Sequence, residues 1–175
     1  MRRSSARDGV RSLAERLRDV PQVGTLTWMG VRPAREAPIQ VLTEGRLTVS
    51  SGLEGDRGAA GVPGKRGVTL VQREHLAVIA ALAGRPDVDP TLVRRNLVIE
   101  GINLASLRLM RFRIGDALLE GTGACEPCAK MEEALGRGGF QAMRGHGGIT
   151  ARVLEGAVVR LGALVRVEGE GAGGG

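Results

Sequence analysis

Short runs in which apolar and polar residues alternate make up most of the chain, and glycine or polar clusters separate them. Alternation with a period of two is typical of β-strands that bury one face. We therefore expect strands at residues 23–28, 39–42, 47–49, 67–71, 96–100, 111–114, 117–121, 149–154, 158–161 and 164–167. The last three follow one another closely, which predicts a β-meander near the C-terminus.

Two later segments repeat their apolar residues at helical spacing instead. Residues 73–83 predict a helix ended by Gly84, and residues 128–135 predict a shorter helix ended by Gly136. More glycines follow the second helix, at positions 138 and 139. Together with Gly136 they predict a hinge-like loop.

The first twenty residues differ from the rest because they are rich in arginine and lack the strand pattern. Four apolar residues fall on one helical stripe there: Val10, Leu13, Leu17 and Val20. Two interpretations stay open for residues 1–20, a short amphipathic helix packed on the body and a disordered arm. We expect a single domain over residues 21–168 and a flexible glycine-rich tail over residues 169–175.

Glycine accounts for 28 of the 175 residues, more than twice its average share of about 7%. Aromatic residues are scarce, with one Trp, two Phe and no Tyr. A chain that turns this often suits many short strands, and its core must be aliphatic. The expected core residues alternate along the strands and are Val68, Leu70, Val98, Ile114, Leu118, Val153, Val159 and Val165.

Arginine carries the net charge of +6, because only two of the 25 basic residues, Lys65 and Lys130, are lysines. Arginine side chains grip phosphate or carboxylate in two places, although many simply cover a solvated surface. The scarcity of aromatic side chains argues against binding of single-stranded nucleic acid, which uses them for stacking. No apolar run reaches the roughly 18 residues of a membrane span, and no secretory signal is evident. We therefore expect a cytoplasmic protein with reduced thiols.

Cys125 and Cys128 bracket a Glu-Pro pair between a predicted strand and a predicted helix. The start of a helix stabilises a thiolate and so favours a single reactive cysteine. Three other interpretations stay open: a thioredoxin-like redox pair, two buried cysteines, and a zinc site completed by His75 and His146. The redox pair lacks a later proline, since none follows Pro127, and the zinc site lacks a second compact half-site.

Two polar segments carry further candidates. Residues 50–64 predict a long glycine-rich loop, of a kind that is usually functional or disordered. Within it Arg57 is suited to clamping an anion, whereas Asp56 also fits a simple turn. The run Arg94-Arg95-Asn96, which precedes a strand, predicts either a phosphate fork or a solvated corner held by Asn96.

A histidine between glycines forms a third candidate segment. Glycines flank His146 on both sides, and Arg144 precedes it. We expect an exposed, mobile turn in which His146 is suited to carrying a proton. His75 lies in a predicted helix, which favours a structural role.

Five segments, taken in order, resemble the MOSC (molybdenum cofactor sulfurase C-terminal) domain family, and its standalone bacterial members in particular. They are residues 52–57 (GLEGDR), 67–76 (GVTLVQREHL), 94–103 (RRNLVIEGIN), 112–135 (FRIGDALLEGTGACEPCAKMEEAL) and 144–156 (RGHGGITARVLEG). The resemblance implies a mainly β fold, namely a β-barrel of the MOSC or pyruvate-kinase-barrel type with a few short helices. It also implies that the site cysteine is the one after Pro127, which is Cys128.

The resemblance implies that the protein binds the molybdenum cofactor (molybdopterin), or carries sulfur for it. Cys128 would be the metal ligand and catalytic thiol, and Cys125 would assist it. Reduction of N-hydroxylated compounds with an external electron donor is the implied oxidoreductase activity. The residues expected to bind the cofactor are Asp56, Arg57, Arg95, Asn96, Arg144 and His146.

Partners follow from the same resemblance. The sulfurase that carries this domain also has a pyridoxal phosphate portion, and 175 residues are too few to include both. We therefore expect a small-molecule substrate or cofactor and a separate sulfur donor or redox partner, with no membrane partner. The alternative drawn from composition is a non-catalytic basic module that binds an acidic partner or nucleic acid.

Overall fold

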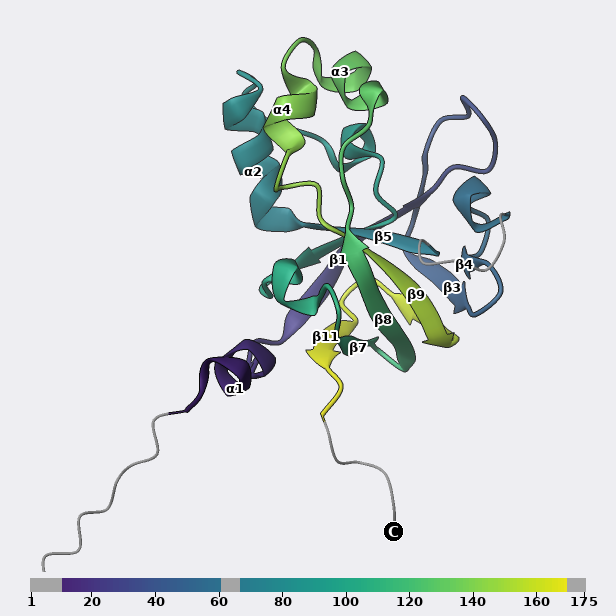
Figure 1. Ribbon diagram of the computed structural model, residues 1–175. Helices are drawn as coiled ribbons and strands as arrows, with labels where there is room; N and C mark the ends of the chain where they lie inside the picture. The colour runs from purple at the N-terminus through teal and green to yellow at the C-terminus, as the bar shows by residue number, and fades with distance from the viewer. Residues whose placement is uncertain (1–10, 61–66, 170–175) are drawn as a thin grey trace, which may run out of the picture.

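The computed structural model describes residues 11–60 and 67–169, and its centre is a closed barrel of seven strands (Figure 1). The barrel strands are β1 (Gly24–Val31), β5 (Val68–Gln72), β6 (Leu97–Glu100), β7 (Arg111–Ile114), β8 (Ala117–Ala124), β9 (Ile149–Glu155) and β11 (Leu164–Val167). Their order is β11-β7-β8-β9-β5-β6-β1, and pairing of β1 with β11 closes the barrel. β5 and β6 run parallel, whereas the other neighbouring barrel strands run antiparallel.

The remaining strands lie beside the barrel. β2 (Gln40–Leu42) pairs with the end of β1, and β3 (Glu44–Thr48) lies between β4 (Gly52–Leu53) and β10 (Ala157–Arg160). The expected C-terminal meander is therefore wrong. Both edges of β9 are occupied, by β5 and β8, so β10 pairs with β3 and β11 pairs with β7 and β1.

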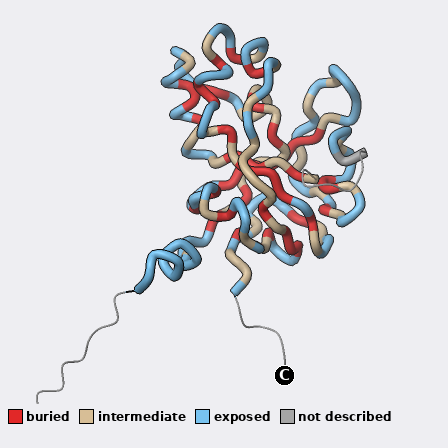
Figure 2. The backbone as a smooth tube through the Cα atoms, viewed as in Figure 1, coloured by how far each residue is buried: buried red, intermediate tan, exposed pale blue. Residues whose placement is uncertain are grey.

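The barrel interior is aliphatic, as the composition predicts. The eight expected core residues are all buried, with exposed fractions of at most 7%. Phe112 is the largest of the fully buried side chains and the main aromatic contribution to this core. Figure 2 shows the buried backbone following the barrel strands.

A layer of short helices covers one end of the barrel and has a second apolar core (Figure 1). Its helices are α2 (Arg73–Leu82), the 3-10 helix η2 (Pro90–Val93), α3 (Ala129–Leu135) and α4 (Gly139–Met143). α4 replaces the expected hinge-like loop. Gly139 is buried, and a Cβ there would lie 2.6 Å from both the Leu135 Cβ and the Met131 carbonyl oxygen, so this glycine permits close packing of α4 on α3.

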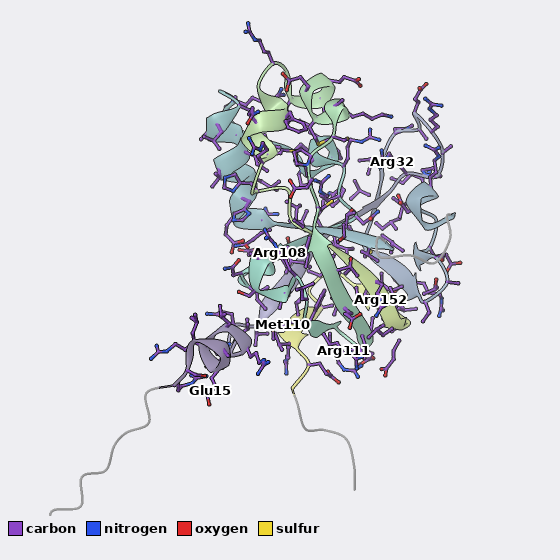
Figure 3. The ribbon with its side chains drawn as sticks, in the orientation of Figure 1. Glu15, Arg32, Arg108, Met110, Arg111 and Arg152 are labelled. Carbon is purple, nitrogen blue, oxygen red and sulfur yellow. The ribbon has the colours of Figure 1, made fainter. Side chains whose placement is uncertain are left out.

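The N-terminal segment forms a helix that does not pack on the body. α1 (Leu13–Arg18) begins with a capping box, in which Ser12 and Glu15 bond to each other's backbone N–H groups. Leu13 and Leu17 remain 72% and 66% exposed, so the expected packing is wrong for these two residues. Val20, which follows the helix, does pack against the barrel core, and Val10 lies outside the described residues. Figures 2 and 3 show α1 standing away from the barrel, with Glu15 on it.

Two shorter 3-10 helices complete the described chain, η1 (Arg57–Ala60) and η3 (Leu104–Leu107). The expected loop at residues 50–64 thus contains β4 and η1, and its last four residues lie outside the described chain. Of the expected tail, residues 170–175 also lie outside it, as do residues 1–10. No helix of the described residues is long and apolar enough to cross a membrane.

Candidate functional site

The two cysteines lie where β8 leads into the helical layer. Cys125 is half-buried and follows the last residue of β8, whereas Cys128 is exposed and is the N-cap of α3. The residues from Cys125 to Cys128 form no turn, and the Cys128 backbone is extended, with φ −121° and ψ 171°.

A buried arginine holds the cysteine segment in place. Arg95 is 6% exposed, and its guanidinium donates to the carbonyl oxygens of Gly147 at 2.7 Å, Val93 at 3.0 Å and Cys125 at 3.0 Å. Burial lowers the Arg95 pKa, and the nearby charges of ionised Cys125 and Cys128 oppose that shift. Arg95 therefore joins three loops and lies within electrostatic reach of both thiols. This role differs from the expected phosphate fork.

The side chains of Asp56 and Asn96 also form hydrogen bonds with neighbouring residues of the protein. The Asp56 carboxylate accepts the N–H groups of Arg32 at 2.8 Å and Gly58 at 2.9 Å. Burial raises the Asp56 pKa, while its hydrogen bonds to Gly58 and Asn96 act the other way. The Asn96 amide oxygen accepts from the backbone and hydroxyl of Thr69 at 3.1 and 2.9 Å. Both side chains thus fix the loops around the site rather than facing an open ligand position.

A strongly basic cavity of about 300 Å³ lies beside these loops. Five cationic side chains line it together with Ala34, Glu36 and Gly58: Arg32, Arg35, Arg57, Arg94 and Lys130. Figure 3 shows Arg32 on this side of the molecule, beyond the end of β1. Lys130 lies in the first turn of α3, whose N-cap is the exposed Cys128, so the cavity reaches the start of the helix that Cys128 caps, although Cys128 does not line it.

Four of the five cations of this cavity form no ion pair with the described residues, although the Glu36 carboxylate also lines the cavity. Among residues 11–60 and 67–169, Arg35 approaches Glu36 at 3.9 Å and the other four form no ion pair. On the barrel side, by contrast, Glu120 accepts from Arg152 at 2.7 Å and lies 3.6 Å from Arg111 (Figure 3). Unpaired cations in a concave site attract anions.

Backbone conformation marks the same cavity. Within the described chain, two non-glycine residues have a positive φ, Glu36 at 63° and Arg94 at 57°, and both line the cavity. Such left-handed residues are uncommon and cluster at functional sites. At Arg94 this conformation separates neighbouring side chains, so that Arg94 lines the cavity while Arg95 is buried.

Sequence reasoning identifies Arg57 as an anion-binding candidate but misses Arg32, Arg35 and Lys130. They come from the loop after β1 and from α3, which only the fold brings together. The only signal in the sequence is their residue type: Arg32 and Arg35 are arginines in a predicted connecting segment, and Lys130 is one of the two lysines of the chain. That signal does not distinguish them from the paired arginines of the barrel.

The sequence as a whole matches a family model, that of the MOSC domain, over residues 39–171. The chain belongs to the MOSC family. This family is associated with the molybdenum cofactor. The match begins after β1, although β1 pairs with both β6 and β11 in this MOSC domain and is needed to close its barrel.

Solved structures share the fold of this MOSC domain. YuaD from Bacillus subtilis aligns with a TM-score of 0.71 at 17% identity, over 85% of this chain and 98% of that one. YiiM from Geobacillus stearothermophilus aligns with a TM-score of 0.67 at 17% identity, over 86% and 77% of the two chains. YiiM from Escherichia coli aligns with a TM-score of 0.63 at 20% identity, over 85% and 72%. No curated protein sequence matches the chain.

The histidines of this MOSC domain form a pair away from the basic cavity. The rings of His75 and His146 meet edge to face, with centroids 5.1 Å apart and planes at 79°. Burial, and then the charge of His146, lower the His75 pKa. His146 is half-buried, and its Nδ1 is buried without a hydrogen-bond partner. The expected turn is present and is exposed at Arg144 and Gly145, but His146 is half-buried because it packs on the His75 ring from α2.

The remaining candidates lie apart from the thiols or fail to cluster. Arg144 is exposed and donates to the Gln141 side chain at 3.2 Å, and neither it nor His146 lines the basic cavity. Nowhere in the described chain do three or more His, Cys, Asp or Glu side chains gather as metal ligands do. The zinc alternative, which needs Cys125, Cys128, His75 and His146 in one cluster, therefore gains no support.

Proposed function

We propose that this MOSC domain binds the molybdenum cofactor, with the Cys128 thiolate at the metal or sulfur position and the basic cavity at the phosphate. One observation carries the proposal: the exposed Cys128 caps α3, whose first turn contributes Lys130 to a cavity lined by five cations, four of which have no ion pair within the described residues. The cofactor combines a soft metal centre with a phosphate, and these are the two chemistries that this pair of features recognises.

The donor set fits each part of that group. A cysteine thiolate is a soft ligand and also a carrier of sulfane sulfur. Arginine forks at positions 57 and 94 would supply bidentate bonds to a phosphate, and Lys130 would add a point charge in the same cavity. When bound, the group would supply a redox-active metal for reducing N-hydroxylated compounds with electrons from an external donor.

The buried residues around the Cys128 thiol hold the loops of the site in position and do not themselves bind the cofactor. Arg95 holds the carbonyl of Cys125 and so fixes where the chain enters the segment that carries Cys128. Asp56 holds the loop that carries Arg57, through the N–H groups of Arg32 and Gly58.

The test is metal and pterin content of protein purified from a host that makes the cofactor. We expect molybdenum and a pterin chromophore with the unchanged chain, loss of molybdenum in Cys128→Ser, and retention in Cys125→Ser. A persulfide on Cys128, seen by mass spectrometry without molybdenum, would favour the sulfur-carrier form. Protein free of molybdenum, pterin and persulfide would contradict the proposal.

The cavity is tested separately through its arginines. Arg57→Ala or Arg94→Ala removes a charge-assisted bidentate contact, which contributes about 1.5–3 kcal/mol and lowers affinity roughly tenfold to a hundredfold. Arg→Lys at the same positions should recover only part of the loss, because an ammonium cannot form the fork. Arg166, exposed on β11, is the matched control and should leave retention unchanged when replaced by Ala.

A second candidate function, a basic module for nucleic acid, is favoured by the net charge of +6 and the unpaired cations. The same variants distinguish it. A duplex binder loses affinity by similar small amounts at each basic residue of its face, and its affinity falls steeply with salt. Losses confined to Arg57 and Arg94, with weak salt dependence, would favour the cofactor site.

A further inference from the structure

The loop that links α4 to β9 lies against the segment that carries both cysteines. The backbone N–H of Cys125 donates to the Gly148 carbonyl oxygen at 2.9 Å. The carbonyl oxygens of Gly147 and Cys125 accept from one guanidinium, that of Arg95, at 2.7 and 3.0 Å. In Figure 1 the two connections run side by side between the barrel and the helical layer. Both backbone groups of Cys125 therefore depend on the position of this loop, either directly or through Arg95.

Two glycines let the loop come this close. A Cβ at Gly147 would collide with the Cys125 carbonyl oxygen, and a Cβ at Gly148 would collide with the Leu70 carbonyl oxygen. Neither glycine has a side chain that could hold the loop in place. His146, directly before them, has one.

The His146 side chain anchors the loop on a fixed support. Its ring meets the ring of His75 edge to face, with centroids 5.1 Å apart. His75 lies in the first turn of α2, which follows β5 directly, and β5 pairs with β9 and β6 in the barrel. Among the described residues the buried Nδ1 of His146 has no hydrogen-bond partner. The contact that holds the loop is therefore one of ring against ring, and the charge on the rings affects it.

A positive charge on this ring pair meets mainly other positive charges. Burial, and then the charge of His146, lower the pKa of His75, while the Glu74 carboxylate acts the other way. Arg108 lines a small cavity together with His75, and Arg144 lies two residues before His146. The cavity measures about 10 Å³ and so holds at most one water molecule. Protonation of both rings would set like charges in contact where little water can separate them.

We propose that His146 is a positioning residue for the thiol site, and that protonation of the histidine pair releases its loop from the cysteine segment. With neutral rings, His146 rests on His75 and holds the two glycines against Cys125. When like charges separate the rings, the loop moves, and the Cys125 N–H loses its acceptor. Any effect on the cofactor rests on the proposed function, because it acts through Cys128. The effect on the Cys125 backbone does not, and it is measured without cofactor.

The Cys125 amide reports directly on the loop. We expect its NMR chemical shift to titrate between about pH 7.5 and about pH 5.5, with the midpoint of the histidine ring resonances. Its hydrogen exchange, corrected for the intrinsic rate, should become about tenfold faster at the lower pH, as for loss of one ordinary hydrogen bond. His146→Phe keeps a ring against His75, loses no bond at Nδ1 and takes up no proton, so its Cys125 amide should stay protected at both pH values. His146→Ala removes the ring and should exchange about tenfold faster at both.

The two thiols provide a second measurement. Cys125 is half-buried and Cys128 is exposed, so release of the loop should expose Cys125 more. A dipyridyl disulfide reacts with thiols at acidic pH, and peptide mapping gives the ratio of Cys125 to Cys128 labelling. That ratio should rise several-fold from about pH 7.5 to about pH 5.5 in the unchanged chain and stay constant in His146→Phe. A ratio that does not change with pH in the unchanged chain would overturn the positioning role of His146.

A variant free of histidine is the control for the titration. The chain has two histidines, so replacing both by Phe leaves carboxylates and thiols as the groups that titrate in this range. A Cys125 amide that does not titrate in the unchanged chain, or that titrates equally in the histidine-free variant, would overturn the proposal. Circular dichroism checks the fold of each variant, and His146→Phe decides the question if His146→Ala unfolds. A titrating Cys125 amide in a chain that binds no cofactor would support the role of His146 and contradict only the proposed function.

Discussion

The barrel and the loops around Cys128 are held together by different interactions. In the barrel, seven strands share backbone hydrogen bonds with two neighbours each, and the interior is filled by aliphatic side chains and Phe112. Around the thiols the helices are short, and the connecting loops depend on polar side chains that bond to backbone groups, above all Arg95.

The two regions differ in how readily one side chain can be replaced by another. Aliphatic side chains of similar volume replace one another in a core with modest loss. A buried guanidinium that serves three carbonyl oxygens has no equivalent among the other side chains, because lysine lacks the fork. The barrel is therefore the tolerant part of the molecule, whereas the thiol site depends on single residues.

The largest expected effect is in the barrel, from Phe112→Ala. Removal of a fully buried phenyl ring leaves a cavity and should lower the free energy of unfolding by about 3–5 kcal/mol. Phe112→Leu should lose much less, which denaturant titration of both variants would measure. Equal losses of unfolding free energy for Phe112→Ala and Phe112→Leu would show that an aliphatic side chain cannot replace Phe112 in the barrel core.

Arg95→Ala should come next, at about 1–3 kcal/mol of unfolding free energy, because it leaves buried carbonyl oxygens unpaired. It should also slow the alkylation of Cys128, which we expect to be the faster-reacting thiol in the unchanged chain. Denaturant titration measures the loss of stability, and limiting iodoacetamide with peptide mapping measures the alkylation rate of each thiol. Arg95→Lys should restore neither quantity fully, and an unchanged alkylation rate in Arg95→Ala would limit Arg95 to stability alone.

A smaller effect is expected from the histidine pair that joins α2 to the loop before β9. Burial and His146 hold the His75 pKa below its ordinary 6.5, so near that pH the unfolded chain binds more protons than the folded one. Stability should therefore fall as the pH drops through about 6.5 towards the lower folded pKa. Unfolding at about pH 7.5 and about pH 5.5 should show this loss, and His75→Gln should reduce it.

The smallest effect is expected on α1, which touches neither region closely. Leu17 is 66% exposed, so Leu17→Ala should change the unfolding free energy by no more than about 0.5 kcal/mol. A clearly larger loss in thermal or chemical unfolding would mean that α1 packs on a surface in solution.

The alternation of apolar residues was enough to predict most strands and the whole expected core. Val68, Leu70 and Ile114 are buried because a period of two places them on one face of a strand, and that is a local property. Helix α4 was missed, because five residues that begin at a buried glycine give almost no periodicity. The family resemblance also rests on local motifs, so it could be identified without knowing which strands pair with one another.

Strand partners and the site were decided by tertiary structure. β10 leaves β9 because β5 and β8 already use both edges of β9, which no local pattern records. Arg94 and Arg95 are identical and adjacent in the sequence, yet one lines the anion cavity and the other is buried beneath the thiols. Their side chains diverge because Arg94 takes a left-handed conformation, and the loops that receive them meet only when the barrel closes.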